Sequence, residues 1–188
     1  MTGRRTVEEQ LARVLDAVRL IESEARPVAD AAGRTLAAPA AAAHDIPLFD
    51  NSAMDGFAVR GADVAEASEE NPVTLRVVAD LPAGVDLDPP LGVGEAARIM
   101  TGSPTPTDAD VIVPFEDTAG GLADSLDEVR VLRAPAKPGV FVRRRGADLH
   151  AGDEVVHAGE RLGPFQLAAA VAQREEVGEH HRLPLRRV

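Results

Sequence analysis

A short run in the first third of the chain, residues 47–58, brings together two carboxylates, an amide, a hydroxyl and a glycine: Asp50, Asn51, Ser52, Asp55 and Gly56. This composition is typical of a turn, and turns hold polar side chains out toward ligands. Asp55 is then an exposed carboxylate that binds a divalent metal or a polar ligand. The alternative is a structural turn, in which Asp50 and Ser52 cap neighbouring amides and Gly56 takes a positive φ.

A second polar turn, residues 98–104, ends an apolar segment with Thr101, Gly102 and Ser103. A threonine hydroxyl and exposed backbone amides are suited to holding an oxyanion. The alternative interpretation is a strand that simply ends in a turn. The run therefore adds a candidate ligand clasp to the carboxylates of the first turn.

A third polar run contains Arg143, Arg144 and Arg145, followed by Gly146 and Asp148. We expect at least two of the three arginines to pair with surplus acidic side chains at the surface. A local phosphate contact is the alternative, because the guanidinium fork matches phosphate geometry. Asp148 is a second candidate carboxylate.

The composition excludes several classes of function. With a net charge of −11 and only 3% aromatic residues, the chain is not expected to bind nucleic acid or an anionic membrane. The absence of cysteine excludes thiolate nucleophiles and cysteine zinc sites. No apolar stretch reaches membrane-spanning length, so we expect a cytoplasmic protein. None of the five histidines has metal-ligand spacing, and we assign no role to them: His44, His150, His157, His180 and His181.

Helical periodicity marks both ends of the chain. A capping box at Thr6–Glu9 begins a helix that we predict over residues 7–24, ending before Pro27, with a short helical turn at 28–32. Near the other end, Pro164 begins a second helix, since its missing N–H costs little at the first helical position. We expect the apolar face of that helix to comprise four side chains: Phe165, Leu167, Ala168 and Val171.

The middle of the chain has the pattern of short strands. The candidate strands are residues 73–77, 111–113 and 129–132, separated by many prolines and glycines, which predicts a small barrel or sandwich. Residues 140–143, 154–156 and 160–162 also have extended character. We therefore predict an α+β protein with an elongated two-domain arrangement. Residues 1–45 and 140–188 form a mixed helical and β domain, and residues 46–139 form an inserted all-β domain.

Four stretches together resemble the molybdopterin molybdenumtransferase family, which includes the E domain of gephyrin. The run Asp50–Gly56 lies within the family's signature, and three further blocks follow it in the family's order. The resembling stretches are residues 45–60, 94–104, 109–118 and 143–148, the last continued by 151–164.

The resemblance implies an activity and a set of site residues. Such proteins insert molybdenum from molybdate into adenylylated molybdopterin with the help of Mg²⁺, and they act as homodimers. By motif, Asp55, Thr101 and Asp148 match polar residues of the family's active cleft, where the two aspartates would hold Mg²⁺ or orient substrate and Thr101 would bind an oxyanion. In the same loops, we predict substrate contacts for three residues: Ser52, Gly102 and Arg145.

The family's molybdopterin-binding α/β domain would begin at about residue 187, and a C-terminal β domain would follow it. We therefore expect this chain to be the N-terminal portion of such an enzyme and to be inactive alone. The molybdopterin-binding domain would come in cis or from a separate chain. The alternative is a non-enzymatic dimerisation module or peptide-binding scaffold.

Overall fold

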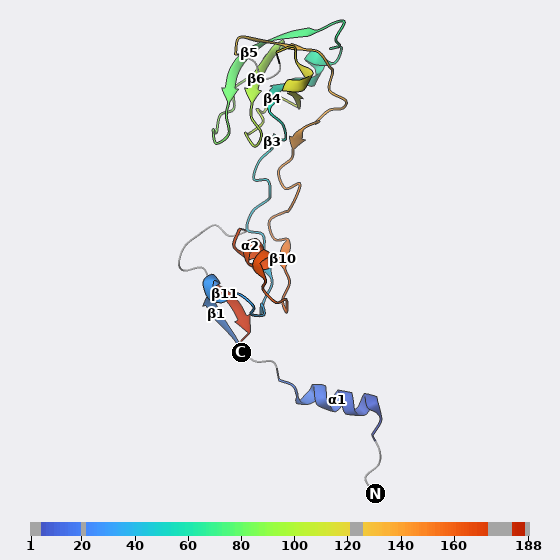
Figure 1. Ribbon diagram of the computed structural model, residues 1–188, viewed down its shortest axis with the longest axis vertical. Helices are drawn as coiled ribbons and strands as arrows, with labels where there is room; N and C mark the ends of the chain where they lie inside the picture. The colour runs from blue at the N-terminus through green and yellow to red at the C-terminus, as the bar shows by residue number, and fades with distance from the viewer. Residues whose placement is uncertain (1–4, 20–21, 121–125, 173–181, 187–188) are drawn as a thin grey trace. The chain divides into compact units, whose positions relative to one another are not determined.

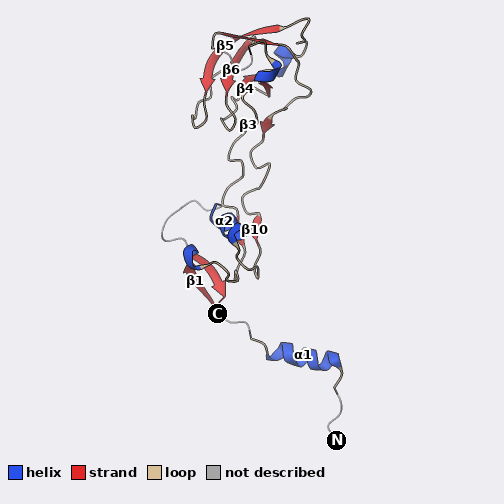
Figure 2. Ribbon diagram, in the orientation of Figure 1, coloured by secondary structure: helices blue, strands red, loops and turns tan. Residues whose placement is uncertain are grey.

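The computed structural model describes residues 5–19, 22–120, 126–172 and 182–186. The chain forms two compact units, one of residues 1–43 and 152–188 and the other of residues 44–151 (Figures 1 and 2). Helices and strands occur together, which confirms the predicted α+β class. Residues 140–151 belong to the second unit. The predicted domain boundaries and the elongated arrangement stay predictions.

In the first unit, two strand pairs and a helix surround a small core. The strands are β1 (Ser23–Pro27), paired antiparallel with β11 (Arg182–Arg186), and β2 (Ala40–Ala41), paired antiparallel with β10 (Glu154–Val156). The 3₁₀ turn η1 (Val28–Asp30) and helix α2 (Pro164–Ala172) complete this unit. Its core consists of small and aliphatic side chains: Ala31, Leu36, Ala40, Val156, Leu162, Ala170, Leu183 and Leu185.

Helix α1 (Val7–Ala17) is shorter than predicted. Thr6 and Glu9 form the expected capping box, but Val18 takes an extended conformation and its amide donates to the Leu15 carbonyl. The last two residues of the predicted helix, Ser23 and Glu24, belong instead to a strand that pairs with β11. Leu20 and Ile21 lie outside the described residues. The helical turn after Pro27 is present as η1.

One prediction about the C-terminal part is wrong, and one strand there was missed. Phe165 was expected on the apolar face of α2 but is 86% exposed, and the side of the helix that packs on the core contains Ala170, Leu167 and Ala169. Strand β11 was not predicted, and it alternates so that Leu183 and Leu185 are buried. His180 and His181 lie outside the described residues.

The second unit is built on a five-stranded mixed sheet in the order β7-β4-β6-β5-β8. Its strands are β4 (Gly56–Val59), β5 (Val73–Leu81), β6 (Glu95–Ile99), β7 (Val111–Pro114) and β8 (Glu128–Val131). The pair β5–β6 is parallel and the other pairs are antiparallel. The 3₁₀ turns η2 (Gly61–Val64) and η3 (Phe115–Asp117) follow β4 and β7.

The two edges of this sheet curl toward each other. Directly after η3, Thr118 bridges Val131 of β8, and the Leu132 amide donates to the Asp117 carbonyl at 2.8 Å. One face of the sheet packs around Phe57 and Phe115, and the other packs around Ile99 and Ile112. Because both faces are covered, β4 is buried at all four positions.

A narrow two-stranded ribbon leads into this sheet. Strand β3 (Asn51–Ser52) pairs antiparallel with β9 (Val142–Arg143), and the pairing extends on one side to a hydrogen bond from the Ala53 amide to the Phe141 carbonyl at 2.8 Å. On the other side, the Ile46 amide and the Leu149 carbonyl pair at 2.8 Å. The ribbon therefore carries the beginning of the first polar turn and all of the third.

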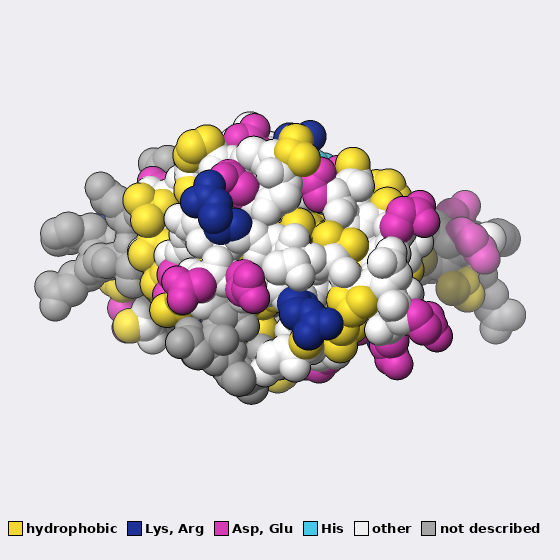
Figure 3. All heavy atoms as spheres, turned by 90° about the horizontal axis from the view of Figure 1, so that it is seen from above, with side chains coloured by type: hydrophobic (Ala, Val, Ile, Leu, Met, Phe, Trp, Pro, Cys, Tyr) yellow, Lys and Arg dark blue, Asp and Glu magenta, His cyan; other side chains and the backbone are white. Residues whose placement is uncertain are grey.

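Neither helix of the described residues has the length and apolar character that crossing a bilayer requires. In the view of Figure 3, acidic side chains are spread over the visible face and basic side chains form separate patches among them. This distribution agrees with the net charge of −11.

Candidate functional site

The first and second polar turns meet at one end of the curled sheet. Asp55 directly precedes β4, and Thr101 lies two residues after β6. Because β4 and β6 pair antiparallel with Gly56 opposite Ile99, the two turns emerge side by side. The Thr101 amide donates a hydrogen bond of 2.7 Å to Oδ1 of Asp55.

This contact keeps an exposed carboxylate ionised. The Thr101 amide is the main cause of the lowered pKa of Asp55, its hydroxyl lowers that pKa further, and slight burial raises it. Both residues are exposed. The two turns therefore present a fixed, negatively charged group to solvent.

Backbone hydrogen bonds at Ser52 and Ser103 join the same two turns. The Ser52 amide donates to the Ser103 carbonyl at 3.0 Å, and the Gly102 amide donates to the Ser52 carbonyl at 2.8 Å. Ser52 is completely buried, and its hydroxyl donates to the Met54 carbonyl at 2.5 Å and accepts from the Met54 amide at 3.2 Å. Ser52 thus orders the loop, as the structural interpretation of this turn proposed.

Gly56 does not have the positive φ that was predicted for it in a structural turn. It is the first residue of β4, and a Cβ there would overlap the Val113 carbonyl oxygen and approach Pro114 Cα to 2.8 Å. The glycine is required for close packing of β4 on β7. Gly102 does take a positive φ of 86°.

The third polar turn forms ion pairs within the ribbon, as was expected for at least two of its arginines. Arg144 contacts Asp50 at 2.5 Å, and Nε of Arg145 donates to Asp45 at 2.7 Å. Burial alone would raise the pKa of Asp50, but hydrogen bonds from the Arg145 amide and the Arg144 guanidinium lower it overall. The pKa of Asp45 is lowered by the Ala151 amide and by Arg145.

The structure joins Asp55 with Thr101 but does not bring Asp148 to them. The Asp148 amide donates to the Ile46 carbonyl at 2.8 Å. In the antiparallel register, Ser52 lies opposite Val142, so Asp55 extends beyond one end of the ribbon while Asp148 lies near the other. Asp148 is exposed, as is Arg145 beside it in the same turn.

Comparison with known proteins identifies the family. The family described as "MoeA N-terminal region (domain I and II)" matches residues 5–173. The chain belongs to this family. Molybdopterin molybdenumtransferase 2 of Mycobacterium tuberculosis H37Rv is 42% identical over 168 residues, which are 89% of this chain and 40% of the relative. Molybdopterin molybdenumtransferase of Synechococcus elongatus is 42% identical over 149 residues, 78% of this chain and 35% of the relative.

Solved structures give the same assignment. The crystal structure of a molybdopterin biosynthesis MoeA protein from Pyrococcus horikoshii OT3 matches with a TM-score of 0.81 and 32% identity, covering 95% of this chain and 45% of that one. The present MoeA N-terminal region therefore spans less than half the length of these relatives. Its relatives are molybdopterin molybdenumtransferases, which agrees with the resemblance found in the sequence.

The carboxylates of this MoeA N-terminal region do not fit a shared Mg²⁺ site. Among the described residues there is no group of three or more histidine, aspartate or glutamate side chains that could hold a metal ion. Asp148 does not lie beside Asp55, and one oxygen of Asp55 already accepts a hydrogen bond from the Thr101 amide.

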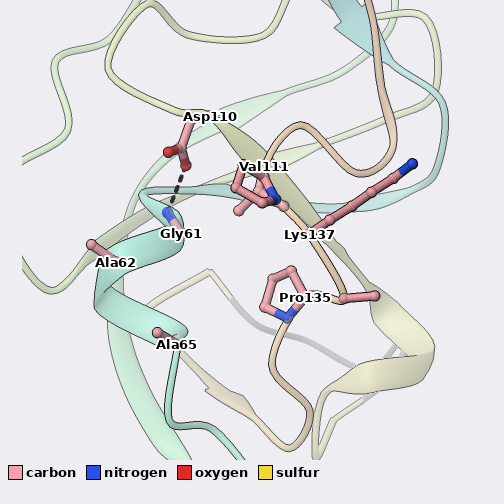
Figure 4. Close-up of a pocket in the computed structure, with 9 residues that line it drawn as sticks. Gly61, Ala62, Ala65, Asp110, Val111, Pro135 and Lys137 are labelled. Carbon is pink, nitrogen blue, oxygen red and sulfur yellow. Dashed lines mark hydrogen bonds between the residues drawn. The ribbon is translucent and has the colours of Figure 1, made fainter.

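A separate cavity of about 360 Å³ lies at the opposite end of β7 from Asp55 (Figure 4). Ala62 and Ala65 line it on one side and Pro135 on the other, and Oδ1 of Asp110 accepts a 2.6 Å hydrogen bond from the Gly61 amide. None of the sequence-predicted site residues is among its lining residues. This mostly apolar cavity is distinct from the Asp55–Thr101 pair.

Sequence reasoning missed Arg98, which lies at the same end of the sheet as Asp55. Its guanidinium lies over the Phe115 ring, with the central carbon 5.8 Å from the ring centroid. The residue belongs to the second polar run, yet no local pattern indicates that its side chain reaches Phe115, which follows β7. Phe141, with a φ of 59°, was also missed, because its identity gives no signal of this left-handed conformation.

Proposed function

We propose that this chain is the N-terminal part of a molybdopterin molybdenumtransferase that inserts molybdenum from molybdate into adenylylated molybdopterin in the cytoplasm. The carrying observation is the Thr101–Asp55 hydrogen bond, because it fixes two of the family's motif residues together at an exposed position. The identity of 42% to molybdopterin molybdenumtransferases supports the same reaction.

In this proposal, Asp55 accepts hydrogen bonds from the substrate while it remains ionised. Thr101 holds the carboxylate in place through its amide, and its hydroxyl, which donates to Asp55 in this structure, would turn to donate to a bound oxyanion. The positive φ of Gly102, a conformation that other residues rarely adopt, brings its amide to the Ser52 carbonyl. Preorganised groups of this kind contribute to catalysis by orienting a substrate without reorganising themselves.

The remainder of the site would come from a molybdopterin-binding domain. Asp148 and Arg145 lie on the ribbon away from Asp55, and they would contact substrate only together with a molybdopterin-binding domain in cis or on a separate chain. We propose that the working enzyme is a homodimer and that this chain is inactive alone. The coverage of 40% of the first relative agrees with a partial site.

A chimera tests this proposal. This chain replaces the matching N-terminal part of molybdopterin molybdenumtransferase 2 of Mycobacterium tuberculosis, and molybdenum insertion is measured with adenylylated molybdopterin and molybdate. The chimera is expected to insert molybdenum, whereas the 188-residue chain alone is not. A folded chimera without activity, tested beside the active parent enzyme, contradicts the proposal. Turnover by the chain alone contradicts the claim of inactivity.

One observation favours a second candidate function, that of a dimerisation module. None of the residues of α1 is buried, and the apolar side chains of the helix are exposed, as is Val18 directly after it: Val7, Leu11, Val14 and Leu15. Exposed apolar stripes of this kind mark contact surfaces. Sedimentation at micromolar concentration should show a dimer that Leu11→Glu disrupts and Glu8→Gln does not. A monomer at all concentrations contradicts this role.

A further inference from the structure

Arg98 connects the strand that carries Thr101 to the segment that holds Asp55. It lies on β6, three residues before Thr101, where the strand register places it opposite Phe57 of β4 and Asp80 of β5. Its neighbours Ala97 and Ile99 face one core, and Arg98 points to the other side of the sheet, where the Phe115 ring lies.

Phe115 transmits this contact to Asp55. The ring is 97% buried and packs edge-on against Phe57, with centroids 5.3 Å apart and an interplanar angle of 87°. The backbone amide of the same residue donates a 3.2 Å hydrogen bond to the Asp55 carbonyl. A cation over the ring face therefore restrains the residue whose amide holds the Asp55 backbone.

Arg98 lowers the stability of the folded protein at this position in one respect. Its Nε is buried and has no hydrogen-bond acceptor within the described part of the chain, and its ion pair with Oδ1 of Asp80 is long, at 3.9 Å. A buried donor without an acceptor lowers stability, and such a group requires an explanation beyond packing. The contact with Phe115 supplies one.

We propose that Arg98 is a positioning residue that holds the Thr101–Asp55 hydrogen bond in register by bracing Phe115. Arg98 fixes one partner through its own strand and the other through the Phe115 ring and amide. Its consequence for molybdenum insertion rests on the proposed function. The contact itself is testable in this chain without activity, so failure of one claim is distinguishable from failure of the other.

Hydrogen exchange tests the proposal. In Arg98→Met, exchange of the Thr101 amide should accelerate at least tenfold relative to the Arg76 amide, which donates to the Gly94 carbonyl in the same sheet. A merely structural role would accelerate both amides by the same factor. Arg98→Lys, which keeps a cation over the ring, should restore most of the protection.

A control and a second variant complete the experiment. Arg76→Met removes an exposed arginine that pairs with Glu95, and it should leave the Thr101 exchange rate unchanged. Phe115→Leu removes the ring and keeps the amide, so it should accelerate Thr101 as Arg98→Met does. If Arg98→Met fails to fold, the Thr101 exchange rate in Phe115→Leu tests the proposal instead. Wild-type exchange of Thr101, relative to the Arg76 amide, in folded Arg98→Met or folded Phe115→Leu would overturn the proposal.

Discussion

The Thr101 amide donates to the Asp55 carboxylate at 2.7 Å, across a separation of 46 residues in the chain. The contact exists because β4 and β6 are neighbours in the sheet and their turns leave it at the same end. It is reinforced by the exchange of backbone hydrogen bonds between the Ser52, Gly102 and Ser103 segments. The two family motifs thus form one structural unit.

The first prediction concerns the acid side of the stability profile. Hydrogen bonds from Thr101 lower the pKa of Asp55 below its ordinary value of 3.8. A lowered folded-state pKa contributes stability that is fully present above the ordinary value and is lost as the pH falls through the lowered one. Asp55→Asn should therefore destabilise the protein at pH 7 and have a smaller effect at pH 3, as measured by urea unfolding. An equal loss at both pH values contradicts this account.

The second prediction concerns Gly56. A Cβ at this position would meet the Val113 carbonyl and Pro114 Cα, which are backbone atoms and cannot turn away. Gly56→Ala should lower the free energy of unfolding by about 3 kcal/mol. Gly84→Ala is the matched control, because its Cβ would meet nothing within 4 Å and only its φ of 88° costs about 1 kcal/mol. An equal loss in the free energy of unfolding for the two variants would contradict the packing argument.

The third prediction concerns the ribbon. Asp50 accepts hydrogen bonds from the Arg145 amide at 2.8 Å and from Arg144. Asp50→Ala should loosen the pairing of β3 with β9 and accelerate exchange of the Ala53 amide, with a loss of about 1 kcal/mol. The control is Asp86→Ala, which removes an exposed aspartate remote from the ribbon in sequence. An unchanged Ala53 exchange rate in Asp50→Ala argues against the clamp.

The fourth prediction concerns α1. The Thr6 hydroxyl accepts from the Glu9 amide at 3.1 Å, and the Glu9 side chain accepts from the Thr6 amide at 3.0 Å. With none of its residues buried, this helix depends on local interactions. Thr6→Ala should cost about 1 kcal/mol of helix stability and shift the Cα chemical shifts of residues 7–17 toward coil values. Gln10→Ala, which keeps the cap, should not.

The sequence predicted those elements whose signal is local. Residues 111–113 form a strand because a β-branched apolar run leaves little alternative, and Pro164 begins α2 as expected. Strand β4 was missed because it is buried on both faces and shows no alternation. The end of α1 was misplaced because Ser23–Pro27 pairs with β11, more than 150 residues away, and tertiary pairing overrides helical periodicity.

In the candidate site, too, local sequence patterns predicted some features and strand pairing set the others. Asp55 and Thr101 were identifiable as polar residues in turns, but their contact depends on the β4–β6 register, which no local pattern contains. The ion pairs of Arg144 and Arg145 followed from charge alone, whereas their partners Asp50 and Asp45 followed only from the ribbon register. Residue types marked the polar turns, and strand pairing determined which residues meet.

The measurement that tests the central claim most directly is single-turnover molybdenum insertion by the chimera with Asp55 replaced. Asp55→Asn should reduce the rate at least a hundredfold at a temperature where the substituted chimera is still fully folded. Glu116→Gln, which changes an exposed carboxylate near the same end of the sheet, should retain the full rate. Insertion by the Asp55→Asn chimera at the unsubstituted rate would contradict the account.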